Sequence, residues 1–380
     1  MSTHARGRGG SALLAVIAAL VVAELLVLGL WRIAAGSVAA ARESAAHDRM
    51  RIEAESALRD AIASWDEAAT PAQPAGIWYV VPGSTRSAGS VHLAVEAIAV
   101  YRGVRLLRST ASVVANGGVR ARAAAEASLS VVPADEFWRD FHSAVVSGGD
   151  VGIAAGDTVD GTNAGTPSPW TAAECPPSAL PAFGPRPGLA LAAGANLTGA
   201  GGTLAGAPPL LNGAARAAPS DFDRVGGVDA PDFRLIADRF ETGSITLASA
   251  SAGSACDTGR RGNWGEPAIP GNPCHDYFPI VYSASDLSIG AGEGQGILIV
   301  DGNLRIAAGV RFYGAILVRG LVDAAGAEVH GSVRISGTAG PSRLGGAFRY
   351  EECALERAFR LAPGLRRLYR VSDRWWLPSF

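Results

Sequence analysis

Four cysteines are the side chains of this 380-residue chain best placed for covalent chemistry. An even number of cysteines beyond an export signal or anchor predicts disulfides. The segment from Cys256 to Cys274 spans 18 positions and is rich in Gly, Pro and Asn, which favours a bridge between these two and leaves Cys175 to pair with Cys353. Zinc is the competing interpretation, but there is no CxxC, and only His275 adjoins one of these cysteines. We therefore expect disulfides and no metal.

Aspartates that could bind ions or sugars are clustered after residue 149. Hard cations favour several carboxylate oxygens, and paired carboxylates carry out glycan hydrolysis. Solvated turn acids are the simpler interpretation, which we adopt, although Asp323 falls where a repeat described below should hold an apolar residue. The aspartates considered are Asp150, Asp157, Asp160, Asp221, Asp223, Asp229, Asp232, Asp286, Asp301 and Asp323.

Motifs and charge argue against several classes of function. The chain has no GxSxG elbow, no P-loop and no dinucleotide fingerprint after a strand, so we expect no catalytic residue and no cofactor. A formal net charge of −2 gives no general attraction to nucleic acid, and we expect no such partner. With 48% hydrophobic residues the chain can bury a sizeable core.

The element that must position the rest is an apolar segment over residues 11–31. As a helix it reaches roughly 30 Å, the thickness of a bilayer core. Its leucines continue to Trp31 and Arg32 without a small-residue cleavage site, which predicts an uncleaved anchor. Arg6 and Arg8 favour a cytoplasmic N-terminus in the inner membrane, so the rest of the chain is expected to be periplasmic or extracellular.

Small residues in this segment would let another membrane helix approach closely. Glu24 is the one acid in the span and predicts either a contact with a neighbouring helix or a tolerated acid. The candidates for helix packing are therefore Ala18, Ala19, Ala23, Glu24 and Gly29.

A charged amphipathic helix is expected to continue to about residue 70, before Pro71 and Pro74. Three segments resemble the N-terminal region of PilX-like pilus assembly proteins: Arg8-Gly9-Gly10, Ala12-Leu13-Leu14 and Glu53-Ala54-Glu55-Ser56-Ala57-Leu58. The resemblance implies a pilin-type helix, a minor pilin-like or pilus assembly role, and partners among other pilin-like membrane proteins. At the fifth position after Gly10, where prepilins typically carry Glu, this chain has Ala15.

Beyond the helix the pattern predicts a mainly β protein. Residues 77–132 hold apolar β-prone runs separated by short turns, which predicts a small antiparallel sheet of the pilin type. Residues 133–149 are predicted to form a connector helix, begun by Pro133 and ended by Gly148-Gly149. Residues 150–243 are rich in Gly, Pro and Ala, and a solenoid could start within them at 151–159.

An internal repeat near the C-terminus predicts a parallel β-solenoid over residues 244–340, with residues 341–380 as a helical and aromatic cap over its end. Three similar segments begin at nearly equal spacing with Gly296, Gly314 and Gly331. A second series recurs at constant spacing with Leu287, Leu304 and Leu321.

Together these patterns divide the chain into a basic leader (1–10), a transmembrane and projecting helix (11–70) and the regions above. They favour a non-catalytic, membrane-anchored pilus assembly or minor pilin-like protein, in the membrane or the fibre, that displays a β-solenoid. One alternative is an anchored β-helix protein that acts on or binds a surface polysaccharide. A second is a bactofilin-like polymerising scaffold, against which the membrane anchor argues.

Overall fold

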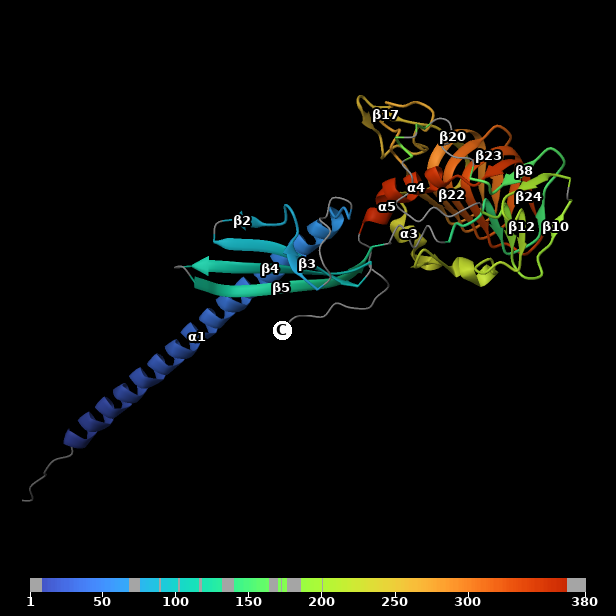
Figure 1. Cartoon of the computed structure of the whole chain (residues 1–380). Coiled ribbons are helices and arrows are strands. Elements are labelled where there is room, and N and C mark those ends of the chain that lie inside the picture. The colour runs from blue at the N-terminus through green and yellow to red at the C-terminus, as the bar shows by residue number, and fades with distance from the viewer. Residues whose placement is uncertain are drawn as a thin grey trace, which may run out of the picture.

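The computed structural model describes residues 9–67, 76–88, 90–101, 103–115, 118–131, 140–163, 170–171, 173–175, 186–199 and 201–367. The protein is mainly β. A long N-terminal helix is followed by a small antiparallel sheet beside it and by a larger parallel sheet whose strands begin at Val145 (Figure 1). The expected fold class is confirmed at this level.

Helix α1 (Gly9–Ala63) has two halves in different surroundings. The apolar half carries exposed side chains from Leu14 to Leu28 and projects away from both sheets (Figure 1). In the second half, buried residues recur every three or four positions and face the antiparallel sheet; they are Met50, Ala54, Ala57, Leu58 and Ala61. This stripe is the amphipathic pattern expected of a helix packed on one side. Pro71 and Pro74 lie outside the described residues.

The antiparallel sheet contains five strands, in the order β1-β3-β4-β5 with β2 beside β3. Alternate side chains such as Val95, Leu107 and Leu129 are buried against α1, as the period of two in a strand requires. Ala123, Ala125 and Ala127 of β5 are buried in the same cluster, and their small side chains let the helix approach closely. The strands are β1 (Trp78–Val80), β2 (Arg86–Ala88), β3 (Val91–Tyr101), β4 (Val104–Ala115) and β5 (Gly118–Ser130).

The second sheet has fifteen strands, and its described pairs are all parallel. We call it the parallel stack. Its strands are β6 (Val145–Ser147), β7 (Val151–Gly152), β8 (Thr158–Asp160), β9 (Leu189–Leu191), β10 (Leu197–Thr198), β11 (Thr203–Ala205), β12 (Leu210–Asn212), β15 (Arg239–Phe240), β16 (Gly243–Leu247), β19 (Ile280–Ser283), β20 (Leu287–Val300), β21 (Leu304–Ile306), β22 (Arg311–Val318), β23 (Val322–Ile335) and β24 (Ser342–Arg349).

Each turn of chain in the stack contributes segments to three ladders of paired strands. The first ladder runs through β6, the second through β7 and the third through β8. Gly296, Gly314 and Gly331 pair in register, as their nearly equal spacing suggests. Equivalent residues of successive turns therefore lie one above another and bury a common core.

The turns are not stacked in chain order. The chain enters in the middle at β6–β8, builds outward to β12, and crosses to the far end at β15 and β16. From there β19–β24 return to the middle, where β24 pairs with β7 and β8. The first and last turns of the stack thus cover each other, and β24 has no free edge there.

Other segments cover two of the three ladders from outside. Residues 213–238 cover the first ladder; they include two 3-10 turns (Pro219–Asp223 and Ala230–Asp232), the hairpin β13 (Arg224–Val225) and β14 (Val228–Asp229), and α3 (Phe233–Ile236). Helix α4 (Glu352–Leu361) contacts β20, β22 and β23, so it lies along the side of the stack. The short helix α5 (Pro363–Arg366) follows it, and a second hairpin has strands β17 (Ser251–Ala252) and β18 (Ala255–Cys256).

Two expectations differ from the structure, and a third lies outside the described residues. Residues 145–147 of the predicted connector helix form strand β6, and its first residues, 133–139, lie outside the described residues. Helix α4 covers the side rather than the end of the stack, because the turn that would need a cap is already paired with β7 and β8. The aromatic tail at 375–380 lies outside the described residues.

Candidate functional site

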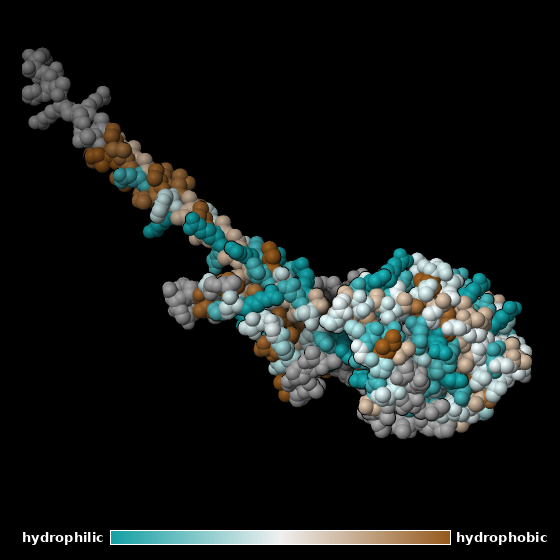
Figure 2. All heavy atoms as spheres, turned by 90° about the horizontal axis from the view of Figure 1, so that it is seen from above, coloured by the Kyte–Doolittle hydropathy of each residue, from teal (hydrophilic) through white to brown (hydrophobic). Residues whose placement is uncertain are grey.

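The apolar half of α1 is one candidate interaction surface. Figure 2 shows a hydrophobic stretch on the helix where it projects from the rest of the protein. Among the described residues, α1 is the one helix long and apolar enough to cross a membrane. Together with two disulfides, this helix indicates a membrane or exported protein.

The predicted helix-packing residues all lie on this exposed half. Ala18, Ala19, Ala23 and Glu24 are exposed, and Gly29 is half-buried. A Cβ atom added at Gly29 would meet no atom within 4 Å, so nothing in the described structure occupies that face. The surface is available to lipid or to another helix.

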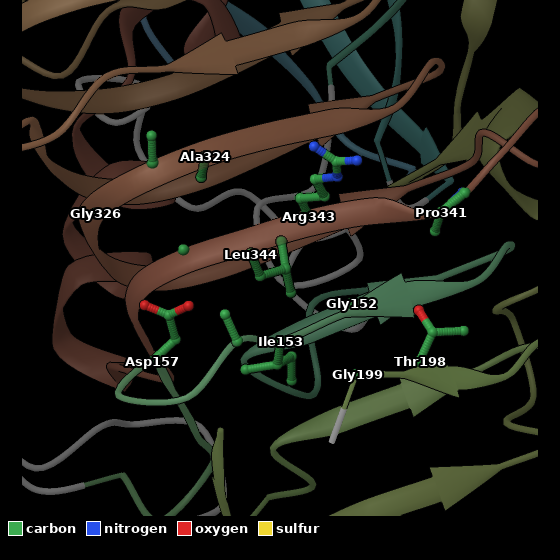
Figure 3. Close-up of a pocket in the computed structure, with 13 residues that line it drawn as sticks. Gly152, Ile153, Asp157, Thr198, Gly199, Ala324, Gly326, Pro341, Arg343 and Leu344 are labelled. Atoms are coloured by element: carbon green, nitrogen blue, oxygen red, sulfur yellow. The ribbon is translucent and has the colours of Figure 1, made fainter. Parts of the chain in front are cut away.

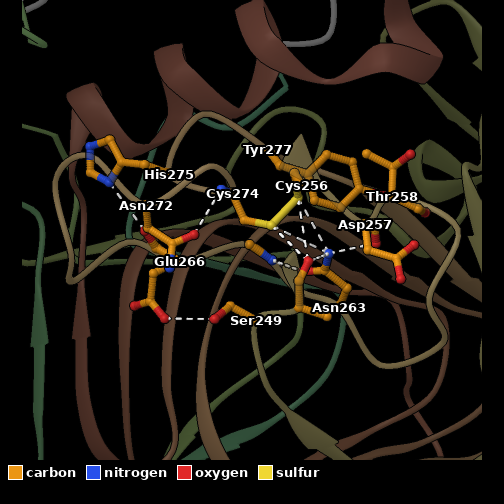
Figure 4. The surroundings of a disulfide bond; sticks show 12 residues. Ser249, Cys256, Asp257, Thr258, Asn263, Glu266, Asn272, Cys274, His275 and Tyr277 are labelled. Carbon is orange, nitrogen blue, oxygen red and sulfur yellow. Dashed lines mark hydrogen bonds between the residues drawn. A yellow bond between two sulfur atoms is a disulfide. The ribbon is translucent and has the colours of Figure 1, made fainter. Parts of the chain in front are cut away.

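Disulfides join the two pairs of cysteines favoured by the sequence. Cys256 and Cys274, with Cα atoms 4.7 Å apart, close the loop that follows the hairpin of β17 and β18 (Figure 4). Inside this loop the Asn263 amide donates to the carbonyl oxygens of Ala250 at 2.9 Å and Asp257 at 2.8 Å. A loop of this length closed by a disulfide gains about 3 kcal/mol in the chain-entropy model.

The second disulfide, Cys175–Cys353, ties the segment around Trp170 to α4. That segment lies over the third ladder, where the Trp170 ring is 5.3 Å from the Tyr313 ring. Arg357 of α4 donates to Asp276 at 2.6 Å, and its guanidinium carbon is 5.0 Å from the Trp170 ring. The covalent and polar contacts together hold a cover over the third ladder.

Glu174 forms the ionic centre of this cover. Its Oε2 accepts hydrogen bonds from the N–H and the hydroxyl of Thr171, both at 2.7 Å, and its Oε1 lies 2.5 Å from Nε2 of His275. Burial alone would raise the pKa of Glu174, but the hydrogen bonds from Thr171 and His275 outweigh it and hold the pKa at about 2. The folded state therefore favours the ionised carboxylate.

We expect Glu174→Gln to flatten the acid limb of the stability curve. A carboxylate whose pKa is lowered on folding stabilises above its unfolded pKa, and that stability is lost as pH falls from about 5 to 2. Guanidinium unfolding at a series of pH values should show the native protein losing about 1–2 kcal/mol more than the variant over that window, a figure reduced for partial exposure. Glu53→Gln, on the exposed face of α1, should behave like the native protein; equal slopes for all three proteins would contradict the assignment.

Most of the predicted aspartates have a structural partner. At corners of the stack, Oδ1 of Asp150 accepts from Asn196 N–H and Oδ1 of Asp286 accepts from Asn303 N–H, both at 2.8 Å. These bonds link one turn to the next, which is the role of a turn acid. The other acids with a described partner are Asp157 (Gly346 N–H), Asp160 (Thr162 N–H), Asp221 (Ala218 N–H), Asp223 (Arg319), Asp229 (Arg224), Asp301 (Tyr282) and Asp323 (Arg305).

The expected register of Asp323 was wrong by one residue. Val322, not Leu321, pairs with Leu304, so Asp323 pairs with Arg305 in the outward row and its side chain is 51% exposed. The spacing in this ladder is therefore not constant, and the extra residue returns Asp323 to solvent. No buried acid needs to be explained by catalysis here.

A trough of about 580 Å³ crosses four neighbouring turns at the corner between the second and third ladders (Figure 3). Its lining consists largely of glycine and alanine. Four of these residues, Gly199, Ala154, Gly345 and Ala325, come from four successive turns. Ile153 and Leu344 point into the core and are buried, so these two large apolar side chains are not exposed in the trough.

Two charged residues flank the trough. Figure 3 shows Arg343 and Asp157 on opposite sides of Leu344. Asp157 Oδ1 accepts the N–H of Gly346 at 2.7 Å, whereas the described residues offer no ion pair or hydrogen bond to the Arg343 guanidinium. The sequence analysis did not predict this site. The one pattern that could have indicated it is the recurrence of Ala-Gly and Gly-Gly pairs at this corner of the stack.

Within the described part of the chain, no group of three His, Cys, Asp or Glu side chains is arranged to hold a metal ion. His275 instead contacts Glu174, and the cysteine beside it is in a disulfide. No protein-family model, curated protein or solved structure matches this chain.

Proposed function

We propose that this protein is a membrane-anchored, non-catalytic minor pilin-like or pilus assembly protein that displays a β-solenoid outside the inner membrane. The observation that carries the proposal is the division of α1. One half is apolar and exposed, and the other buries a stripe of residues against an antiparallel sheet. A helix that passes from a membrane onto such a sheet is the plan of a pilin.

The displayed domain of this proposal is the parallel stack, interpreted as a short β-solenoid. Three ladders of parallel strands, in which equivalent residues of successive turns pair in register, support this interpretation. A single turn cannot bury its apolar face, but stacked turns form a continuous core. Disulfides at Cys175–Cys353 and Cys256–Cys274 fit an oxidising compartment, which favours a periplasmic or extracellular position.

The proposal assigns the exposed half of α1 to contacts with lipid and with other pilin-type helices. Arg6 and Arg8, which lie outside the described residues, favour a cytoplasmic N-terminus. Ala18, Ala23 and Gly29 would allow a partner helix to come close. Glu24 is assigned to the same interface, because an ionised acid in a span costs about 2.5–3.5 kcal/mol unless it finds a polar neighbour.

Gentle shearing of cells, followed by detection of this chain in the fibre and membrane fractions, tests the proposal. We expect the chain with the fibres or crosslinked to other pilin-type proteins in the membrane. Gly29→Leu should weaken that co-purification, because its side chain would hold the helices apart. Gly36→Leu, at an exposed glycine of the same helix where an added Cβ also meets nothing within 4 Å, is the matched control.

A chain confined to the membrane, with no pilin-type protein crosslinked to it, would overturn the pilus assignment and leave a separate anchored protein. Co-purification of the Gly29→Leu variant at the level of the native protein would instead remove Gly29 from the interface.

A further inference from the structure

One ladder of the parallel stack has no cover among the described residues. Outward residues of the first ladder, such as Ile299 and Leu317, are fully buried beneath 213–238, and those of the third ladder, such as Tyr313 and His330, lie beneath the cover tied by Cys175–Cys353. In the second ladder, outward residues alternate along each strand with buried ones, and the outward residues are exposed or half-buried. We call this row the open face.

The open face is a continuous column of small and polar residues from seven turns. Each member is a strand partner of the next: Ser244, Ser288, Arg305, Asp323, Arg343, Gly152 and Thr198. At about 4.8 Å per strand, the column extends for roughly 30 Å along the stack. A ligand that fits one turn can therefore meet similar backbone surroundings at the next, which suits an extended polymer.

Charge is uneven along the column. Arg305 is neutralised by Asp323 at 3.4 Å, but the Arg343 guanidinium has no such partner among the described residues. Its neighbour on the other side is Gly152, which leaves the space beside Arg343 empty and opens the column into the trough. A planar guanidinium beside open space is suited to bidentate binding of a carboxylate.

The opposite side of the trough supplies hydrogen-bond acceptors rather than a cation. Asp157 Oδ1 is used by Gly346 N–H, and its second oxygen remains to accept a hydroxyl. Gly346, which Asp157 binds, follows Arg343 by three residues, so the backbone positions of the two sides lie at most about 10 Å apart along the strand. The hydroxyl of Thr198, exposed in the neighbouring turn, donates to the carbonyl oxygen of Val151 at 3.2 Å, so its oxygen can accept a further hydrogen bond.

We propose that the open face and the trough bind a carboxylate-bearing polysaccharide, laid along the stack with a uronate-type carboxylate on Arg343. A hydroxyl-rich chain fits a floor of glycine backbone and alanine methyl groups. A peptide fits less well, because the trough exposes no free strand edge for strand addition and no pocket for a large apolar side chain. The proposal needs only the exported stack, and it stands or falls independently of how α1 is used.

Fluorescence anisotropy with labelled alginate oligomers tests the proposal, using the full-length protein in detergent. Arg343→Gln should weaken binding about tenfold or more, because a charge-assisted pair is lost. Ala325→Trp should do the same by filling the trough without touching a charge. The matched controls, Arg224→Gln and Ala252→Trp, change exposed residues away from the open face and should bind like the native protein.

Neutral dextran should not bind, and rising salt should weaken alginate binding. The proposal is overturned if alginate does not bind, or if Arg343→Gln and Ala325→Trp leave its affinity unchanged. Equal binding of a poly-glutamate peptide or of anionic vesicles would also overturn it, since the site would then select charge rather than a glycan. None of these results depends on pilus fractionation, so this proposal and the pilus assignment can fail separately.

Discussion

Gly331→Ala is expected to unfold the parallel stack. Gly331 has a φ of 140°, and an added Cβ would lie 1.9 Å from the carbonyl oxygen of Gly314 in the turn before it. Both obstacles are backbone, so neither the φ angle nor the contact can relax without breaking the ladder. We expect a loss of more than about 4 kcal/mol, which is exceptional for a single substitution and a large part of a domain's stability.

The same restriction recurs at the stacked glycines of the neighbouring turns, which explains why these glycines repeat in the sequence. Gly314 has a φ of 133° with its Cβ position 2.0 Å from the Gly296 oxygen, and Gly296 has a φ of 126° with its Cβ position 2.3 Å from the Pro279 oxygen. The chain turns a corner here between the third and first ladders, and the neighbouring turn is too close for any side chain.

Guanidinium unfolding and limited proteolysis measure the effect. The control is Gly309→Ala, because Gly309 also has a positive φ, 79°, but no atom lies within 4 Å of its Cβ position. Alanine there should cost only about 1–2 kcal/mol for the left-handed backbone. If the two variants lose similar amounts of stability, the positive φ alone, and not the close approach of adjacent turns, requires glycine at residue 331.

These glycines also show how far the sequence predicts the fold. Residues held by contact between adjacent turns leave a periodic signal, so the register of Gly296, Gly314 and Gly331 could be predicted. The apolar span could be predicted from its length and hydropathy. The two cysteine pairs could be predicted from the composition of the loop between Cys256 and Cys274.

The order of the turns could not be predicted, because it depends on contacts between segments far apart in the chain. Strand β6 pairs with β23, and β7 and β8 pair with β24, all about half the chain away. Each of the three contributes three residues or fewer to its ladder. Such short runs carry no usable period; Phe141 and Val145 fit one face of a helix as well as an irregular segment that leads into a strand. Long-range pairing decides in favour of the strand.

The error at Asp323 has a different cause. The turn before it holds one more residue than the turn before Leu304, and a shift of one residue moves a side chain to the opposite face of a strand. The trough was missed because it is formed by small residues. Its members come from four turns, two of them in the region of low periodicity before residue 243, and only their stacking places Arg343 beside Gly152.

Two arginines placed in the apolar half of α1 are expected to release the protein from the membrane. In Leu20→Arg/Leu26→Arg each charge costs about 2.5–3.5 kcal/mol at the centre of a span on insertion scales. Both leucines are exposed, at 60% and 62%, so neither change disturbs the packing of the described structure. The variant should move from the carbonate-washed membrane fraction to the soluble fraction or fail to be exported.

The control Val38→Arg/Ile52→Arg adds the same charges at exposed apolar positions beyond residues 11–31 and should stay in the membrane. Retention of both variants would show that something other than α1 attaches the protein. Release of both would show that total charge, rather than its depth in the span, determines the location. N-terminal sequencing of the membrane form adds the decisive comparison: an intact segment before Arg32 fits an anchor, whereas its removal would make α1 an export signal and end the pilin comparison at that residue.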